Sequence, residues 1–146
     1  MTRYFTLQQA ERLLPKVERA LREAIRMKSE YQDAETELRS AMQRVMMLGG
    51  VDLNRGAFIE LRRRRETGAE RLRDVMQEIA EVGCLVKDLD IGLIDFPTLF
   101  RGEEVYLCWK LGEPGIAFWH GVEEGFRGRK AIDKEFLDNH GGEPPN

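Results

Sequence analysis

The sequence predicts an α+β protein in which a long antiparallel helical hairpin packs with a small antiparallel sheet. Two observations lead to this prediction. Apolar residues recur at helical spacing through most of residues 6–83, and the period then changes to short strand-like runs separated by turn residues. The length of 146 residues, with 42% hydrophobic residues, suits one domain with a modest core. We therefore expect a single domain with a helical hairpin over 6–83, a small sheet carrying the candidate site over 84–130, and a short helix and disordered tail over 131–146.

The first helix is predicted to begin at Thr6, because Thr6 and Gln9 have the spacing of a capping box. Pro15 lies inside the helical pattern and predicts a kink or a break at that point. The pair Gly49-Gly50 should end the helix, because glycine adopts the left-handed conformation at low cost. The helix carries a seven-residue apolar repeat with coiled-coil-like spacing at Leu13, Ala20, Met27, Ala34, Ala41 and Leu48.

The second helix is predicted over residues 55–82, with Asp52 or Asn54 as its cap and Gly83 at its end. The run Arg62–Arg65 resembles a nucleic-acid handle, but four successive helical residues point in four directions. Glu60 lies four residues before Arg64, and Arg62 four before Glu66, which allows ion pairs within the helix. We therefore interpret this run as a solvated, salt-bridged face.

After Gly83 the pattern predicts three or four short antiparallel strands. Arg101-Gly102 is suited to a two-residue hairpin turn, and residues 112–115 form a second turn signal. A flexible basic loop over 125–130 and one or two helical turns within 131–139 should follow, before a disordered tail from Gly141. The predicted strands lie within 84–86, 93–94, 103–111 and 116–119.

Charge and cysteine content narrow the classes of partner. The net charge is only −3, so there is no strong field to attract nucleic acid or an anionic membrane. No apolar run approaches the ~20 residues that cross a bilayer. Cys84 and Cys108 are far apart and form no CxxC motif, which fits a reducing compartment. We expect a cytoplasmic protein that binds neither membranes nor nucleic acid.

Clustered carboxylates after the second helix point to a divalent metal. Asp88 and Asp90 are two residues apart, with Asp95 close behind, and clustered carboxylates are typical ligands of hard divalent cations. The alternative is that Asp88 and Asp90 are turn residues whose side chains accept hydrogen bonds from nearby amides. In extended backbone Asp88 and Asp90 point the same way, and two hairpin turns could bring His120 beside them. We therefore predict one metal site formed by Asp88, Asp90 and His120.

His120 follows an apolar strand and is the main candidate for a catalytic or metal-binding histidine. It needs a carboxylate to fix its tautomer, and Glu113 and Asp95 are candidates both for that role and for catalysis. The alternative is a partly buried histidine bonded to the backbone. A mixed zinc site with Cys108 is a further alternative, but if Trp109 faces the core then Cys108 faces away from it, and no pattern fixes the remaining ligands.

Basic residues near this segment are candidates for binding an anionic small molecule. Arg127 and Arg129 are separated by glycine and could hold a phosphate or carboxylate, with Lys87 nearby. Alternatively, the two arginines pair with Glu123-Glu124 or with the clustered aspartates. For Lys87 we predict an ion pair with Glu113 or Asp95, because a lysine lowers the mutual repulsion of these acids.

The segments YFTLQQAERLLP, VKDLDIGLIDFP, LCWKLGEP, FWH and GFRGR, in this order, resemble an uncharacterised prokaryotic family catalogued as domain of unknown function 2203. The resemblance covers nearly the whole chain. It implies a small cytoplasmic protein of bacteria or archaea and brings no activity with it. The recurrent segments include the candidate residues Lys87, Asp88, Asp90, Asp95, Glu113, Trp119, His120 and Arg129.

Two functions fit these patterns. The first is an oligomeric binding or scaffold protein with an acidic and histidine site in its sheet. The second is a small enzyme, dependent on a divalent metal or an anion, that acts on a phosphorylated or carboxylated metabolite. Two helices with broad apolar stripes cannot bury them fully against each other and one small sheet, so we expect a homodimer in which the hairpins pair. An enzyme would need its candidate residues to converge in a cleft.

Overall fold

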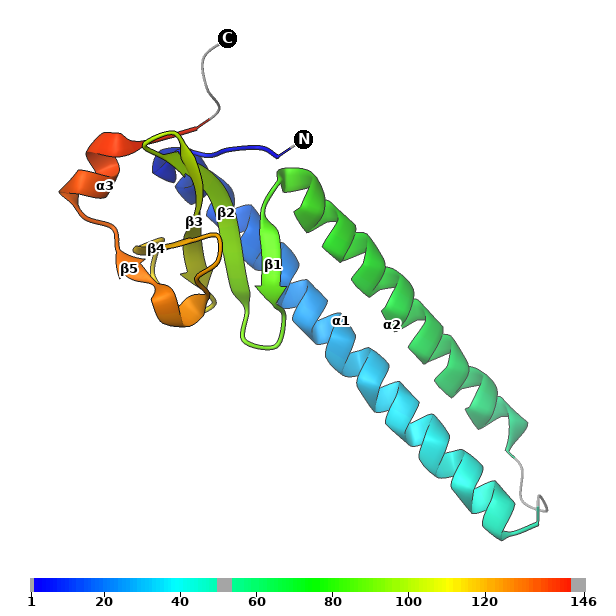
Figure 1. Ribbon diagram of the computed structural model, residues 1–146. Helices are drawn as coiled ribbons and strands as arrows, with labels where there is room; N and C mark the ends of the chain where they lie inside the picture. The colour runs from blue at the N-terminus through cyan, green and yellow to red at the C-terminus, as the bar shows by residue number, and fades with distance from the viewer. Residues whose placement is uncertain (1, 50–53, 143–146) are drawn as a thin grey trace. The chain divides into compact units, whose positions relative to one another are not determined.

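The computed structural model describes residues 2–49 and 54–142. The chain divides into two compact units, which we call the sheet unit (Met1–Leu21 with Gln77–Asn146) and the arm (Arg22–Met76). The predicted α+β class is confirmed: two long helices are combined with an antiparallel sheet and a short third helix (Figure 1). No helix in the described part of the chain is both long enough and apolar enough to cross a membrane.

Helix α1 (Leu7–Met47) begins with the predicted capping box. The Gln9 amide donates to Thr6 Oγ1 at 3.1 Å, and the Thr6 amide donates to Gln9 Oε1 at 2.9 Å. A further cap comes from the distant C-terminal region, because the Leu7 amide donates to His140 Nε2 at 3.1 Å. The ring of His140 therefore carries its hydrogen on Nδ1, which donates to the Leu137 carbonyl at 3.0 Å.

Helix α1 continues through Pro15, so the predicted alternative of a break is wrong. Proline inside a helix costs about 3 kcal/mol, because a hydrogen bond is lost and the preceding turn is crowded. On either side of Pro15 the side chains of Leu14, Val17 and Leu21 are buried. Each buried apolar side chain of this size contributes roughly 1.5–3 kcal/mol, and together they outweigh the cost of the proline.

Helix α2 (Arg55–Val82), which belongs to the arm as far as Met76, has the predicted bounds. Asn54 is its cap, since Asn54 Oδ1 accepts from the Ala57 amide at 3.1 Å. The other predicted cap, Asp52, and the predicted stop at Gly50 lie outside the described residues. Gly68 allows close approach of the two helices, because a Cβ there would lie 3.4 Å from the backbone nitrogen of Tyr31. At the end of α1 itself, Gly49 has the expected left-handed conformation (φ 65°).

The arginine run on α2 forms ion pairs, as predicted, but with different partners. Arg63 pairs with Glu60 one turn earlier, at 2.6 Å, in place of the expected Glu60 to Arg64 pair. Arg64 and Arg65 reach across to α1, where they pair with Glu37 and Glu35 at 3.3 and 3.4 Å. The sequence spacing could not show these pairs, because they depend on the register of one helix against the other.

The sheet has six strands, more than the three or four predicted. The additional strands are only two residues long, too short to leave an alternating pattern in the sequence. All pairs of neighbours are antiparallel, and the path runs β1-β2-β3-β4-β5 with β6 beside β2. The strands are β1 (Leu85–Asp88), β2 (Leu93–Phe100), β3 (Glu103–Lys110), β4 (Phe118–Gly121), β5 (Lys130–Ala131) and β6 (His140–Gly141).

The hairpin of β2 and β3 fixes the two faces of the sheet. Its turn is the predicted Arg101-Gly102, with both residues at positive φ (53° and 81°), as a tight hairpin turn requires. One face, which we call the helix face, carries Phe96, whose ring contacts that of Phe5 just before α1. Side chains on this face form much of the core: Ile94, Phe96, Thr98, Val105, Leu107 and Trp109 are all buried. Alternation places Asp95, Tyr106 and Cys108 on the opposite face.

Helix α3 (Lys134–Asn139) confirms the predicted C-terminal helix. Its buried Phe136 stacks on Phe100 and Trp119, at ring-centre distances of 5.3 and 4.9 Å. The prediction that the disordered tail begins at Gly141 is wrong. Gly141 belongs to β6, and its carbonyl accepts from Thr98 Oγ1. The rest of that tail, residues 143–146, lies outside the described residues.

The contact between His140 and α1 predicts a measurable stability effect. His140→Phe keeps a flat ring stacked on Phe136 but removes the acceptor for the Leu7 amide. We expect the free energy of unfolding to fall by about 1 kcal/mol, the usual cost of a lost helix cap. Urea denaturation followed by circular dichroism measures the change. Asp138→Ala, at an exposed position of the same short helix, is the control, and equal stabilities of the two variants would contradict the cap.

Candidate functional site

Three buried polar side chains meet on the face of the sheet opposite the helix face. Asp95 on β2 lies directly opposite Cys108 on β3, and His120 on β4 lies diagonally beside Cys108. One ligand atom from each of the three side chains lies within 4.8 Å of the other two. The residues are 1%, 0% and 3% exposed, respectively. We call this group the Asp-Cys-His cluster.

The ring of His120 faces an oxygen atom at each nitrogen. Its Nδ1 lies 2.8 Å from the Gly121 carbonyl, and its Nε2 lies 3.0 Å from Asp95 Oδ2. A carbonyl oxygen only accepts, so Nδ1 carries a hydrogen. The contact between Nε2 and Oδ2 then needs a second hydrogen, on the ring or on the carboxyl, or a cation in its place. The sequence predicted Asp95 or Glu113 as the carboxylate partner of His120, and in the structure the partner is Asp95.

Asp95 and Cys108 are buried side chains, and the polar atoms of Asp95 are not fully paired. Asp95 Oδ1 is buried and has no hydrogen-bond partner in the described structure. An unpaired buried polar atom costs about 1–3 kcal/mol. Burial, together with the nearby charge of Asp95, raises the pKa of Cys108 to about 12, so without a further positive group the side chain is a thiol. The cluster therefore has an unpartnered acceptor, Asp95 Oδ1, next to the sulfur of Cys108 on the neighbouring strand.

Beside the cluster, Arg129 and Glu113 form a two-point ion pair. The guanidinium donates from Nη1 and Nη2 to the two Glu113 carboxylate oxygens, at 2.9 Å each. Its Cζ lies over the rings of Phe118 and Phe126, at 4.1 and 4.4 Å from their centres. Its Nη1 also lies 4.0 Å from Cys108 Sγ. Arg129 therefore connects the loop before β5 to the cluster, while its charge is already balanced by Glu113.

The loop between β4 and β5 is held by Glu124. Its Oε1 accepts from the Gly121 amide at 2.8 Å and from Lys130 Nζ at 2.6 Å. Hydrogen bonding to Lys130, followed by that to the Gly121 amide, lowers the pKa of Glu124. A Cβ at Gly121 would lie only 2.8 Å from Glu124 Oε1, so a larger residue at this position would displace the Glu124 side chain. The segment predicted to be a flexible basic loop thus contains an ordered turn, the 3-10 helix Phe126–Gly128.

The structure does not bring Asp88 and Asp90 to His120. Asp88 Oδ1 accepts from the amides of Asp90 and Ile91, at 3.0 and 3.4 Å, which is the turn role given as the alternative. Asp88 aligns with Leu93 on β2, whereas His120 aligns through β3 with Pro97. These two positions are about 13 Å apart along the strand, and β1 and β4 are separated by three strand intervals of about 4.8 Å. The carboxylate beside His120 is Asp95.

The basic residues that were candidates for binding an anion also differ from the prediction in the contacts that they make. Glu113 and Asp95 have Arg129 and His120 as partners, so the ion pair predicted for Lys87 is corrected. Lys87 Nζ instead lies 5.0 Å from the ring centre of Tyr106. Arg129 pairs with Glu113 and not with residues 123–124, and Arg127 is exposed. Lys87 and Arg129 therefore have separate neighbours in the structure, Tyr106 for Lys87 and Glu113 for Arg129.

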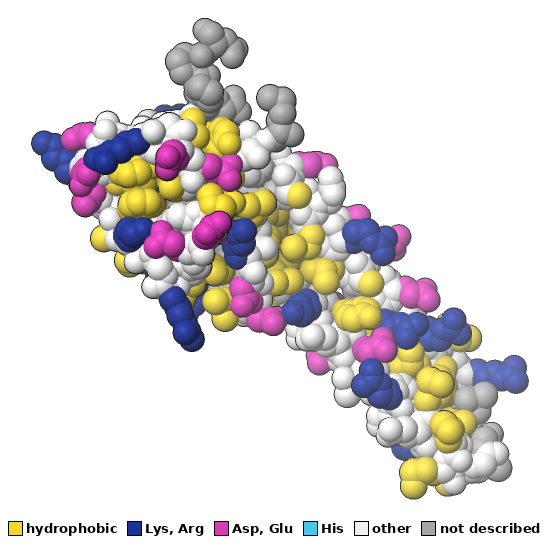
Figure 2. Space-filling model, in the orientation of Figure 1, with side chains coloured by type: hydrophobic (Ala, Val, Ile, Leu, Met, Phe, Trp, Pro, Cys, Tyr) yellow, Lys and Arg dark blue, Asp and Glu magenta, His cyan; other side chains and the backbone are white. Residues whose placement is uncertain are grey.

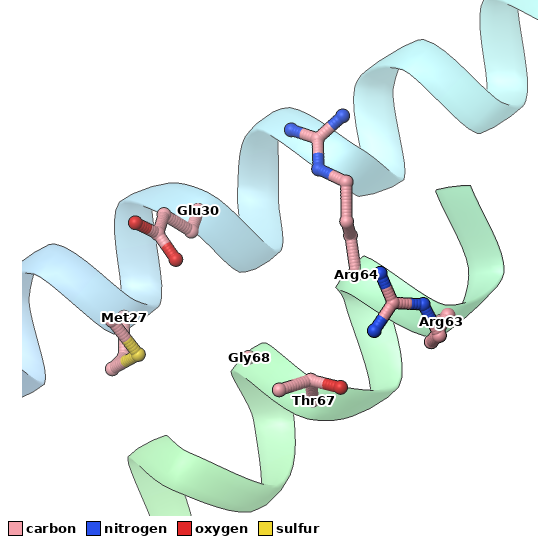
Figure 3. Close-up of a pocket in the computed structure, with 6 residues that line it drawn as sticks. All are labelled: Met27, Glu30, Arg63, Arg64, Thr67 and Gly68. Atoms are coloured by element: carbon pink, nitrogen blue, oxygen red, sulfur yellow. The ribbon is translucent and has the colours of Figure 1, made fainter. Parts of the chain in front are cut away.

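A hollow on the arm is another candidate location for a ligand. It has a volume of about 380 Å³ and lies over Gly68, with Arg63 and Arg64 toward one end and Glu30 on the facing helix (Figure 3). Both arginines are already paired, with Glu60 and Glu37. The hollow therefore offers no concentrated charge, and the Asp-Cys-His cluster is the stronger candidate.

Cys108 is the member of the cluster that sequence reasoning undervalued. The sequence does contain the signal: Asp95 lies six positions before Arg101, and Cys108 lies six positions after Gly102. A two-residue hairpin places such residues directly opposite each other. His120 could not be located in this way, because the connection from β3 to β4 includes residues 111–117 and has no standard geometry.

Substitution of Asp95 should lower the free energy of unfolding by an amount that depends on the new residue. Asp95→Ala leaves His120 Nε2 without a partner, and we expect it to lower the free energy of unfolding by about 3 kcal/mol. Asp95→Asn can donate from its amide to Nε2 and should cost about 1 kcal/mol. Urea denaturation measures both variants. The exposed Asp88→Ala should cost less than Asp95→Ala, and equal losses for these two would show that the buried contact contributes little.

The ion pair of Glu113 predicts a dependence of stability on acid. Burial raises the pKa of Glu113, but hydrogen bonds from Arg129 and the Lys110 amide outweigh it, and the pKa lies below the ordinary 4.5. The unfolded chain therefore takes up this proton first as the pH falls. The stability from Glu113 is complete above about pH 4.5 and is lost as the pH falls through the lower folded value.

Thermal unfolding from pH 6 to pH 3 should thus show a smaller acid-induced loss for Glu113→Gln than for the unchanged protein. Glu103→Gln, an exposed glutamate at the start of β3, is the matched control. If the unchanged protein and Glu113→Gln lost stability in parallel, the pair with Arg129 would have no role in acid sensitivity.

Comparison with known proteins gives one result on this chain. No curated protein and no solved structure matches it. The family model described as uncharacterized conserved protein (DUF2203) matches residues 3–132, which include all of the Asp-Cys-His cluster and the Arg129–Glu113 pair. The resemblance found in the sequence segments is confirmed, and the chain belongs to the DUF2203 family.

Proposed function

We propose that this protein is a self-associating binding protein, in which the arm joins two copies and the sheet unit holds a ligand in a closed site. The observation that carries the proposal is the apolar surface near the turn of the arm. Met46, Met47 and Ile59 are 79%, 86% and 65% exposed, and Met42 and Leu48 are more than half exposed. Hydrophobic side chains reach the surface in this part of the arm (Figure 2). Grouped apolar exposure of this kind marks interaction surfaces.

The same part of the arm also contains a groove, of about 350 Å³. The groove lies between α1 and α2 and is lined by Ala41, Arg44, Val45, Leu48, Asn54, Ala57, Phe58 and Leu61. Projecting methionines and an apolar groove on one segment make that segment complementary to itself. A two-fold contact, in which each copy inserts its methionines into the groove of the other, uses both features. We therefore propose a second copy of this chain as the partner.

The charges of the arm favour this partner over nucleic acid. Arg63, Arg64 and Arg65 have glutamate partners, so the arginine run has little unbalanced charge with which to attract phosphates. Both cysteines of the chain are free, which is the state that the reducing cytoplasm maintains, and we propose that compartment.

An enzyme is the second candidate, and one observation favours it. Asp95 Oδ1 is an unpartnered buried acceptor, and such groups gather at functional sites. An enzyme acting on a phosphorylated or carboxylated metabolite would, however, need that metabolite to reach the reacting groups. The three cluster residues are at most 3% exposed, and the nearby Arg129 is already paired with Glu113. A closed binding site therefore has more support than a catalytic cleft.

The self-association is tested by sedimentation equilibrium at micromolar protein concentration, where we expect a dimer. The double variant Met46→Glu/Met47→Glu should weaken the dimer at least about tenfold, because four charges would enter an apolar contact. Leu137→Glu introduces a charge at an exposed apolar position of the sheet unit and should leave the dimer intact. A monomeric unchanged protein, or a double variant that dimerises as well as Leu137→Glu, would contradict the proposal.

A further inference from the structure

We infer that the Asp-Cys-His cluster is a binding site for a transition metal ion of the zinc class, with Asp95, Cys108 and His120 as its ligands. The inference names the ligand of the closed sheet site in the proposed function and does not depend on self-association of the arm. Thiolate, imidazole and carboxylate are the three side-chain groups that bind zinc in proteins. Each comes from a different strand of one sheet, which holds the three at fixed spacing.

The distances suit such an ion after an adjustment of up to about 1 Å. Tetrahedral ligands about 2.0–2.3 Å from zinc lie roughly 3.3–3.7 Å from one another. The three ligand atoms lie within 4.8 Å of one another, and His120 Nε2 lies 3.0 Å from Asp95 Oδ2. An ion between these two groups needs them to separate by a few tenths of an ångström. Three protein ligands leave a fourth position for water or a bound molecule.

The unpartnered oxygen of Asp95 is the second, independent observation. Asp95 is 99% buried, and its Oδ1 has no hydrogen-bond partner in the described structure. The two atoms His120 Nε2 and Asp95 Oδ2 both carry lone pairs, so their contact needs either a hydrogen or a cation between them. One ion bound to the imidazole, the sulfur and both oxygens of the Asp95 carboxylate would satisfy all of these groups at once.

Charge balance favours a doubly charged ion. A thiolate and a carboxylate together carry two negative charges, and a neutral imidazole adds none, so one dication leaves the buried site neutral. Calcium and magnesium prefer oxygen ligands, and two of the three donors here are sulfur and nitrogen. The Gly121 carbonyl accepts from His120 Nδ1, which directs Nε2 toward the ion, as second partners of metal-binding histidines commonly do.

Arg129 complements the site without disturbing this balance. Its Nη1 lies 4.0 Å from Cys108 Sγ and could donate to a thiolate there, while Glu113 neutralises its charge. Cys84 provides the contrast within the same chain. It is also buried and free, but its Sγ lies 3.7 Å from the Ile79 carbonyl oxygen, and it belongs to no group of metal-binding residues in the described structure.

The test is a cobalt titration of the full-length protein after treatment with a chelator, with zinc as the displacing ion. We expect one cobalt per chain, an absorption band from charge transfer between thiolate and cobalt, and loss of that band when zinc is added. Cys108→Ser should abolish the band, and Cys84→Ser should retain it. Asp95→Asn and His120→Gln should weaken cobalt binding at least about tenfold, as loss of one ligand does.

Folding is checked on the same samples by circular dichroism, so that a lost band in Cys108→Ser cannot come from unfolding. If only Cys108→Ser proves unfolded, the band in Cys84→Ser and its weakening in Asp95→Asn decide the question. A folded, unchanged protein that binds no cobalt, or binds it without the thiolate band, overturns the inference, as does a band that survives in Cys108→Ser. Sedimentation of these samples reports dimerisation separately, so failure of the metal site and failure of the arm contact are distinguishable.

Discussion

The pairing of β2 with β3 is the interaction on which the rest of the sheet unit depends. A tight turn at Arg101-Gly102 joins them, and the ladder runs without a bulge from Phe100 opposite Glu103 to Leu93 opposite Lys110. Because side chains alternate across a strand, this single register places Phe96 and Trp109 on the helix face. It also places Asp95 opposite Cys108 on the other face. A shift by one residue would exchange the two faces and remove both the core and the cluster.

This alternation explains why polar groups are buried in the middle of a small sheet. The helix face is covered by apolar residues such as Phe5 and Phe136. The opposite face is covered by a polar arrangement that includes Arg129, Glu113 and the loop held by Glu124. Polar groups can be buried there because most of them pair with one another. Asp95 Oδ1 is the exception, and it lies at the centre of the proposed site.

Local signals in the sequence predicted most of the fold. The capping box at Thr6, the bounds of α2 and the turn at Arg101-Gly102 each depend on a few neighbouring residues, and all three are confirmed. The break at Pro15 was wrong, because burial of side chains on both sides of the proline outweighs its local cost. The strands β5 and β6 could not be predicted, because two-residue strands exist only through their partners.

The site was harder to predict than the fold, because its members are brought together by register and not by sequence proximity. Asp88 and Asp90 formed the most visible motif, yet Asp88 accepts hydrogen bonds from the amides of its own turn. Asp95 and His120 were among the candidates, and their contact needed the path of β4 to be known. Burial and strand register, and not spacing in the sequence, distinguish Asp95 and His120 from the more obvious acidic pair.

Three neighbouring strands bring a carboxylate, a sulfur and an imidazole to one point, where we propose that zinc binds. X-ray absorption spectroscopy of the zinc-loaded, full-length protein tests this most directly, because it reports the atoms around the metal. We expect one sulfur at about 2.3 Å and nitrogen or oxygen ligands, at least one of them imidazole, at about 2.0–2.2 Å. A zinc environment without sulfur, or one with sulfur that is unchanged in Cys108→Ser, would contradict it.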